Sequence, residues 1–165
     1  DVLGSRGLGD VYKRQVEDDE LIVAFLDMVE NHKMIVENSG LLTVAALKHL
    51  GVKDKRVVSI LSGGNMDVIT MSSVVQQGLI FRDRIFTVSV LLPDKPGELA
   101  KVSQTLADVQ GNVIKLEHNQ FVTTNRSAAV ELRITLECFG TEHKEQIIAA
   151  LEKKGYKPRI VRTMI

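Results

Sequence analysis

Two kinds of hydrophobic pattern divide the chain. Up to about residue 78 the apolar residues come at helical spacing or in an unbroken run, whereas from Arg84 they alternate with polar residues. Alternation over several residues is typical of a strand with one buried and one solvated face. The pattern therefore predicts two structurally different parts.

The first part is predicted to be helical around one buried strand. Residues 16–33 begin with acidic residues and place Leu21, Phe25 and Met28 on one stripe, which predicts a helix. Residues 56–61 (RVVSIL) are mostly apolar in succession, which suits a strand of a parallel α/β sheet with helices on both faces. Three further segments are an extended stretch ending in a turn (34–40), a helix closed by Gly51 (41–50) and a helix ended by Gly78 (66–77).

The second part is predicted to be a βαββαβ unit. Its first strand, residues 84–92, points Phe86, Val88, Val90 and Leu92 to one side. The other segments are a turn at 93–96 and a helix closed at Gly111, strands at 112–122 and 127–139, a helix at 142–154 between an N-cap Thr141 and Gly155, and a strand at 157–164. In the third strand Ala128, Val130, Leu132, Ile134, Leu136 and Cys138 are expected to face inward, and Glu131, Arg133, Thr135 and Glu137 to face solvent. This order predicts a ferredoxin-like fold, with four antiparallel strands, two helices on one face and the other face open.

Changes in composition predict the domain boundaries. Residues 1–15 contain three glycines and scattered charges without periodicity, so we interpret them as a non-native or disordered leader and exclude them from the fold. Residues 79–83 (LIFRD) are the expected linker. The predicted domains are therefore residues 16–78 and 84–165.

The composition excludes several classes of protein. The chain has 21 basic and 21 acidic residues, no Trp and two Tyr, which argues against a nucleic acid partner. No apolar run reaches the ~20 residues that span a bilayer, so no membrane segment is expected. The single cysteine, Cys138, cannot form an intramolecular disulfide; we expect a buried, inert thiol and a cytoplasmic protein. The four histidines lack metal-ligand spacing, so no metal site is predicted.

The main candidate for chemistry is the stretch Ser62, Gly63, Gly64 and Asn65, which directly follows the expected strand. Ligands bind at the carboxyl ends of strands in α/β sheets, and glycines let a ligand approach the backbone closely. An ordinary turn is the alternative, because turns prefer the same residue types.

Three segments carry a resemblance to a known family: MIVENSGLLTVAAL (34–47), VVSILSGGNMD (57–67) and LPDKPGELAKVSQTLA (92–107). They closely resemble the C-terminal third of the pyridoxal-phosphate-dependent threonine ammonia-lyases (threonine dehydratases) that end in one ACT regulatory domain. The resemblance extends from Val16 to the C-terminus. It implies a partial lyase segment of the tryptophan-synthase-β-like α/β fold, followed by a ferredoxin-like ACT domain.

The resemblance implies contacts with pyridoxal 5'-phosphate in the full-length parent. Ser62 would lie against the pyridine nitrogen, Gly63 and Gly64 would clear space beside the ring, and Asn65 would hold the loop through its side chain. Glu37 matches a family carboxylate near the cofactor, although an exposed acid in a turn is an equal alternative.

The resemblance also implies an amino-acid effector at the turn before the first ACT helix. The expected effector-binding residues are Asp94, Lys95, Pro96, Gly97, Glu98, Leu99 and Asn112. Backbone N–H groups at a helix start can hold a carboxylate, and Asp94 or the Asn112 region can meet an ammonium. A Pro-Gly helix start without ligand, in a domain that only pairs subunits, is the alternative.

The family's Schiff-base lysine motif, Ser-Phe-Lys or Ser-Tyr-Lys, and its phosphate-binding glycine run do not occur in the chain. We therefore assign no catalytic residue and interpret the chain as a C-terminal fragment that is inactive alone. The resemblance implies a parent that converts threonine to 2-oxobutanoate and ammonia, is controlled by isoleucine or valine, and forms a homo-oligomer. Two alternatives stay open: a stand-alone ACT module that senses an amino acid, and a serine dehydratase or racemase parent.

Overall fold

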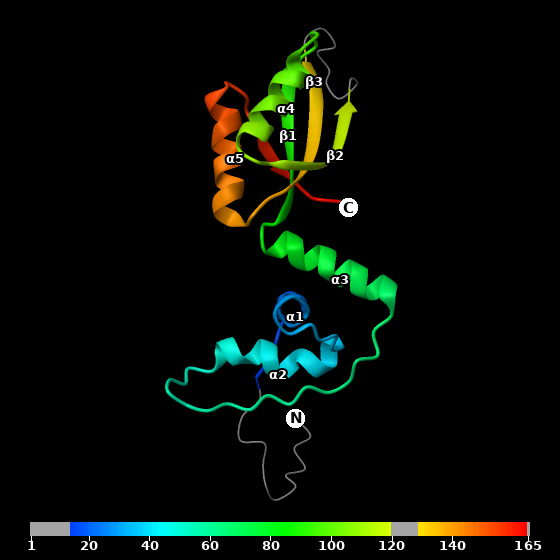
Figure 1. Ribbon diagram of the computed structural model, residues 1–165, viewed down its shortest axis with the longest axis vertical. Coiled ribbons are helices and arrows are strands. Elements are labelled where there is room, and N and C mark those ends of the chain that lie inside the picture. Colours follow the sequence, from blue (N-terminus) through cyan, green and yellow to red (C-terminus); the bar gives the residue numbers. More distant parts are fainter. Residues whose placement is uncertain (1–13, 120–128, 165) are drawn as a thin grey trace, which may run out of the picture. The chain divides into compact units, whose positions relative to one another are not determined.

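The chain folds into two compact units divided between Val75 and Gln76 (Figure 1). The computed structural model describes residues 14–119 and 129–164. Helix α3 (Val68–Phe81) does not end at Gly78 as predicted, because the Gly78 carbonyl accepts a bond from the Arg82 N–H and an interior glycine costs a helix only about 1 kcal/mol. Residues 79–81 of the expected linker are therefore helical, while the expected domain boundaries stay predictions.

The first unit begins with helix α1 (Asp18–Asp27), as the acidic start and apolar stripe predicted. A capping box closes its N-terminus, in which the Glu17 N–H donates to Glu20 Oε2 at 3.0 Å. The helix continues as a π-helical turn (Met28–His32) and ends at Lys33, whose φ is 57°. A separate core forms around α1, made of Leu21, Ala24, Phe25, Met28, Val36, Leu41, Ala45 and Val74.

The helix expected at residues 41–50 is a set of short turns. One α-helical turn, α2 (Leu42–Ala45), lies between 3₁₀ turns at Asn38–Leu41 and Ala46–His49. The last turn ends at Leu50 in an extended conformation, so the prediction that Gly51 closes the helix in the left-handed region is wrong. A bond from the Leu50 N–H to the Leu47 carbonyl tightens this end instead.

Glu20 joins the end of this set of turns to α1. Its Oε1 lies 2.8 Å from Lys48 Nζ and 2.9 Å from His49 Nε2. These bonds, the one from Lys48 foremost, lower the pKa of Glu20 to about 2. The carboxylate therefore stays charged throughout the neutral range.

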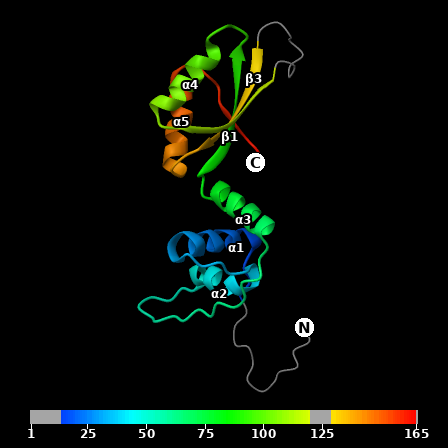
Figure 2. The same ribbon diagram turned by 45° about the vertical axis from the view of Figure 1, so that its right-hand side comes forward.

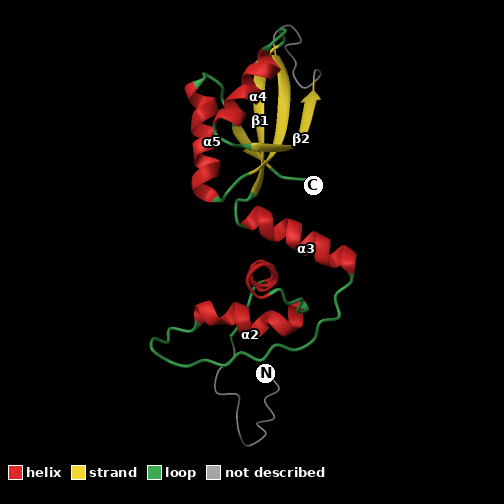
Figure 3. Ribbon diagram, viewed as in Figure 1, coloured by secondary structure: helices red, strands yellow, loops and turns green. Residues whose placement is uncertain are grey.

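Residues 56–61 form no strand, so this prediction is wrong for the described chain, where the segment is a loop (Figure 3). Val58 is 89% exposed and Ile60 is 74% exposed. A strand needs neighbouring strands to pair its backbone groups, and all strands among the described residues belong to the second unit. The parallel sheet expected of the first part is not formed here.

The second unit has the predicted βαββαβ order and ferredoxin-like arrangement. Its antiparallel sheet has the strand order β2-β3-β1-β4. Helices α4 and α5 both lie on one face of this sheet (Figures 1 and 2). The elements are β1 (Ile85–Pro93), α4 (Glu98–Asp108), β2 (Asn112–Asn119), β3 (Ala129–Glu137), α5 (Thr141–Lys153) and β4 (Arg159–Val161).

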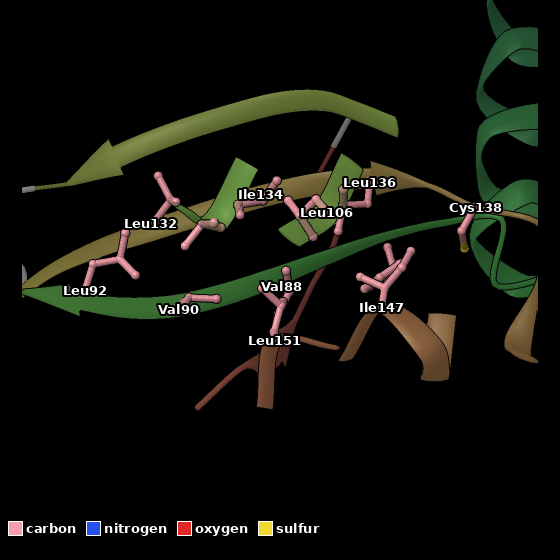
Figure 4. Packing of buried hydrophobic residues seen from close by; sticks show 12 residues of the cluster. Val88, Val90, Leu92, Leu106, Leu132, Ile134, Leu136, Cys138, Ile147 and Leu151 are labelled. Carbon is pink, nitrogen blue, oxygen red and sulfur yellow. The ribbon is translucent and has the colours of Figure 1, made fainter. Parts of the chain in front are cut away.

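The predicted inward face of the sheet forms the core beneath the helices (Figure 4). The strand pairing places Val88 opposite Ile134 and Val90 opposite Leu132, and all four side chains are 0% exposed. Helix residues complete this core, with Val102 and Leu106 from α4 and Ile147 and Leu151 from α5. The inward assignments from Val130 to Cys138 are confirmed, and Ala128 lies outside the described residues.

The opposite face is less solvated than predicted, because its polar side chains pair with each other. The hydroxyls of Thr87 and Thr135 lie 3.0 Å apart, and Ser89 Oγ donates to Glu131 Oε1 at 2.6 Å. All four residues are buried, so solvent exposure is wrong for Glu131 and Thr135. Cross-strand pairs of this kind are the unit of sheet stabilisation.

The start of α5 is fixed by Asp83, which lies shortly before β1 in the second unit. Gly140 is the N-cap, so the prediction that Thr141 caps the helix is wrong. The Thr141 hydroxyl instead donates to Asp83 Oδ2 at 2.8 Å, and Lys144 Nζ donates to Asp83 Oδ1 at 2.6 Å. The bond from Lys144 is the main reason why the pKa of Asp83 is lowered.

In the second unit, one of the two helices ends at a left-handed glycine as predicted. Gly155, with a φ of 88°, terminates α5 as predicted. After α4 the left-handed residue is Gln110, with a φ of 60°, rather than Gly111. The Gly111 N–H still bonds to the Leu106 carbonyl and closes the helix.

We predict that Leu136→Ala destabilises the second unit by about 2–5 kcal/mol, because Leu136 is 0% exposed and its truncation leaves a cavity in the core. Leu116→Ala deletes the same atoms from edge strand β2, where the side chain is 38% exposed, and should cost less than half as much. Urea unfolding followed by circular dichroism measures both. Equal losses would contradict the core described above.

We predict that Asp83→Asn lowers the free energy of unfolding by about 1 kcal/mol, because the amide NH2 cannot accept one of the two bonds and the other loses its charged acceptor, while asparagine still tolerates the Asp83 φ of 53°. A lowered folded pKa stabilises the protein above the ordinary value of 3.8, and this contribution is lost as the pH falls below it. The difference between variant and wild type should therefore shrink below about pH 3.8. Asp94→Asn, at an exposed turn, is the control without effect.

Candidate functional site

The loop of Ser62 to Asn65 is held against the segment that contains Glu37. The Glu37 N–H donates to the Gly63 carbonyl at 3.3 Å, and Thr43 Oγ1 donates to the Ile60 carbonyl at 2.9 Å. Among the described residues, the Asn65 side chain makes no such bond. Backbone pairing and Thr43 therefore fix the loop, a role that the sequence analysis gave to Asn65.

Two glycines permit this close packing. A Cβ on Gly40 would overlap the Ser62 carbonyl oxygen, and a Cβ on Gly63 would overlap the Glu37 carboxylate. Gly63 also has a φ of 78°, which favours glycine. The sequence analysis identified Gly63 but missed Gly40, whose only signal was its place in the turn motif at residues 37–40.

The Glu37 carboxylate lies against Gly63 of the loop, and a neighbouring serine orients it. Ser39 Oγ donates to Glu37 Oε1 at 2.7 Å. Ser62, Gly63, Gly64 and Asn65 are all exposed, so the loop offers a hydroxyl and bare backbone to solvent. The structure therefore brings Glu37 and the predicted cofactor loop together.

Asp67 fixes the exit of this loop into helix α3. Its Oδ1 accepts bonds from the Ile69 and Thr70 N–H groups at 3.0 and 2.9 Å, and its Oδ2 accepts one from the Thr70 hydroxyl. These bonds, the hydroxyl bond foremost, lower the pKa of Asp67. The sequence analysis missed this cap, although aspartate before a helix is a usual signal.

The second candidate site is the turn of residues 94–99, which is open to solvent. Gly97 is the N-cap of α4 with a φ of 91°, and a Cβ there would meet no atom within 4 Å. Leu99 is 41% exposed, and Lys101 pairs with Glu98 at 2.7 Å. The Glu98 N–H bonds to the Lys95 carbonyl at 3.4 Å, so the turn presents the next N–H groups of α4, those of Leu99 and Ala100, beside an apolar side chain.

Asn112 lies at the other end of the sheet from this turn. Asn112 and Ile85 are both paired with Glu137, whereas Pro93 is paired with Ala129. Eight strand residues separate the two ends, a distance of roughly 26 Å. The Asn112 Nδ2 donates to Glu137 Oε2 at 3.0 Å. Within one chain the expected effector residues are therefore not brought together.

His143 and Cys138 have structural partners. The Phe139 N–H donates to His143 Nδ1 at 3.1 Å, so Nε2 carries the proton and donates to the Val109 carbonyl at 2.6 Å. Cys138 is buried and its burial raises the pKa of the thiol, as expected of an inert cysteine.

None of the helices that the structure describes is long and apolar enough to cross a membrane.

We predict that Gly40→Ala destabilises the first unit by more than about 1 kcal/mol, because the added methyl group cannot fit against the Ser62 carbonyl. The matched control is Gly51→Ala, where a Cβ meets nothing within 4 Å and the φ is not positive. There the change should be neutral or stabilising by about 0.4–1 kcal/mol. Thermal unfolding measures both, and a neutral Gly40→Ala would contradict the close packing of the loop.

Comparison with known proteins finds a family match in the second unit and similar proteins over most of the chain. Residues 86–155 match the ACT domain family. The chain is 35% identical over 143 residues to an L-threonine ammonia-lyase of Geobacter sulfurreducens, with 86% of the chain and 36% of the relative covered. It is 32% identical over 147 residues to an L-threonine ammonia-lyase of Thermotoga maritima, with 88% and 37% covered.

A third relative is an L-threonine dehydratase biosynthetic IlvA of Pasteurella multocida, 30% identical over 145 residues, with 86% of the chain and 27% of the relative covered. The chain thus spans between about a quarter and two fifths of the length of these relatives. Along most of its length the chain is similar to part of the threonine ammonia-lyases, and its second unit contains an ACT domain.

Proposed function

We propose that this chain is the C-terminal part of a pyridoxal-phosphate-dependent threonine ammonia-lyase, in which the ACT domain binds a regulatory amino acid. The parent would convert threonine to 2-oxobutanoate and ammonia. The observation that carries the proposal is the combination of a complete βαββαβ ACT unit with similarity to threonine ammonia-lyases over 86% of the chain.

The loop at Ser62 fits one side of the cofactor. Pyridoxal phosphate supplies the electron sink for removing the α-proton and β-hydroxyl of threonine. In this chain the exposed Ser62 hydroxyl would donate to the ring nitrogen, and the bare backbone of Gly64 would let the ring approach the loop, whereas the place of a Gly63 side chain is taken by Glu37. The Glu37 carboxylate under Gly63 would add a negative charge nearby.

The exposed apolar residues before this loop support a larger domain around it. Val58 and Ile60 keep 89% and 74% of their area exposed, which is unusual for residues that directly precede a candidate site. Strands of the parent enzyme, paired on both sides of residues 56–61, would cover them. The strand expected there would then form only in the full-length parent.

The turn before α4 is the proposed effector site. Its helix start can hold a carboxylate through backbone N–H groups, and Leu99 can contact the side chain of isoleucine or valine. Because Asn112 lies at the far end of the sheet, it could join this site only from a second copy. This supports a homo-oligomer as the regulatory form.

A second candidate function is a stand-alone amino-acid-sensing ACT module. It is favoured by the separate core of the second unit, in which both helices and the sheet bury their apolar faces against each other. Conversion of threonine by the full-length parent would support the first function, and its absence would support the second.

We predict that the chain alone does not produce 2-oxobutanoate from threonine with added pyridoxal phosphate, because the Schiff-base lysine motif is absent. A colorimetric assay of the keto acid measures this. The full-length parent serves as the positive control, and turnover by the 165-residue chain would contradict the fragment interpretation.

We predict that isoleucine or valine binds the chain and that Gly97→Asp abolishes this binding, because a negative side chain would occupy the carboxylate position. In Gly97→Asn the new side chain has the shape of aspartate without its charge and tolerates the φ of 91°. This variant should weaken binding much less than Gly97→Asp does. Isothermal titration measures both variants. Equal affinities of the two variants would exclude a carboxylate at this helix start.

A further inference from the structure

A hollow of about 440 Å³ is lined mainly by strand residues that point away from the core beneath α4 and α5. The strand pairing shows why its residues share this face, since Ser89 is opposite Arg159 on one side and Arg133 on the other, and Leu91 is opposite Glu131. A volume of this size is within the range of small-molecule sites. The lining residues are Ser89, Leu91, Glu131, Gly155, Lys157, Arg159 and Val161.

The floor of the hollow is a fixed carboxylate. The Glu131 side chain is only 10% exposed, and Ser89 Oγ donates to its Oε1 at 2.6 Å. Glu131 Oε2 forms an ion pair with Arg133 Nε at 3.2 Å, but neither of these buried atoms has a hydrogen-bond partner among the described residues. The bond from Ser89 lowers the pKa of Glu131, which therefore remains charged.

A buried carboxylate oxygen that accepts no hydrogen bond is costly. The second charge on this floor, Arg133, is 39% exposed and can also interact with solvent. The arrangement leaves Glu131 able to gain from a positively charged group brought into the hollow.

The rim has the opposite charge. Lys157 and Arg159 are exposed, and neither forms an ion pair with the other described residues. The walls are apolar, with Leu91 49% exposed and Val161 partly buried. The hollow therefore combines a floor that holds the Glu131–Arg133 ion pair, a positive rim and an aliphatic wall.

We propose that this hollow binds a free aliphatic α-amino acid, with its ammonium group toward Glu131 and Ser89, its carboxylate toward Arg159 and Lys157, and its side chain against Leu91 and Val161. Arg133 pairs with Glu131 on the floor and the two rim residues add positive charge, so the hollow favours the carboxylate of a ligand, while Glu131 is the acceptor for its ammonium group. A zwitterion uses both kinds of group. This site does not rest on the effector site proposed at the α4 turn, which is a separate place in the fold.

The test compares three ligands by isothermal titration with the 165-residue chain. L-isoleucine carries both charges, 3-methylpentanoate lacks the ammonium group, and 2-methylbutylamine lacks the carboxylate. The proposal predicts binding of isoleucine and an affinity lower by at least about tenfold for either analogue, since each loses one charged hydrogen-bonding group. Equal binding of isoleucine and 3-methylpentanoate, or no binding of isoleucine, would overturn it.

Two variants assign the binding to the hollow. Glu131→Gln keeps the size of the side chain and its bond from Ser89, and Arg159→Gln changes an exposed residue that folding does not need. Each should lower the affinity for isoleucine by about tenfold or more. The matched control Arg162→Gln removes an exposed charge outside the hollow and should bind as wild type.

The variants also separate the hollow from the α4 turn. Binding that survives Arg159→Gln and Glu131→Gln but is lost in Gly97→Asp would assign the ligand to the turn and overturn the hollow. The reverse pattern supports the hollow and removes the turn as the effector site. Melting temperatures check the folding of Glu131→Gln, and if that variant unfolds, Arg159→Gln alone decides.

Discussion

The second unit depends on the burial of one apolar sheet face beneath α4 and α5. Strand β1 lies between β3 and β4, so its alternate residues supply the centre of this face and meet those of β3 in register. Because residues on a strand alternate between faces, the same register collects Ser89, Leu91 and Glu131 on the other side. Core packing on one face thus determines which side chains can form a site on the other.

In the first unit, close backbone contact positions the loop at Ser62, in addition to the core around α1. The loop at Ser62 lies so near Gly40 that no side chain fits between them, and backbone bonds join the same segments at Glu37 and Gly63. Such contacts hold a loop in place without covering it. The loop is consequently both positioned and exposed, which a ligand-binding loop requires.

The sequence predicted the second unit well and the first unit poorly, for a physical reason. Alternation in β1 and β3 is satisfied by partners within the chain, so local pattern and tertiary structure agree. The run at residues 56–61 has strand-like residues but no pairing partner among the described residues, and a strand cannot form from propensity alone. Similarly, the pattern placed Glu131 and Thr135 on the correct face, but their burial arises from cross-strand partners that a single segment does not reveal.

The candidate sites differ in whether a sequence motif marks them. The turn at Gly97 and the loop at Gly63 were found because glycine marks both, and both have a positive φ. Asn112 was placed with the turn from family resemblance, yet strand register separates them by the length of the sheet. The hollow at Glu131 has no motif, since Ser89, Glu131 and Arg159 come from three strands and meet only through pairing. An amino acid bound there would contact all three strands, so its binding would depend on the register of the sheet rather than on one loop.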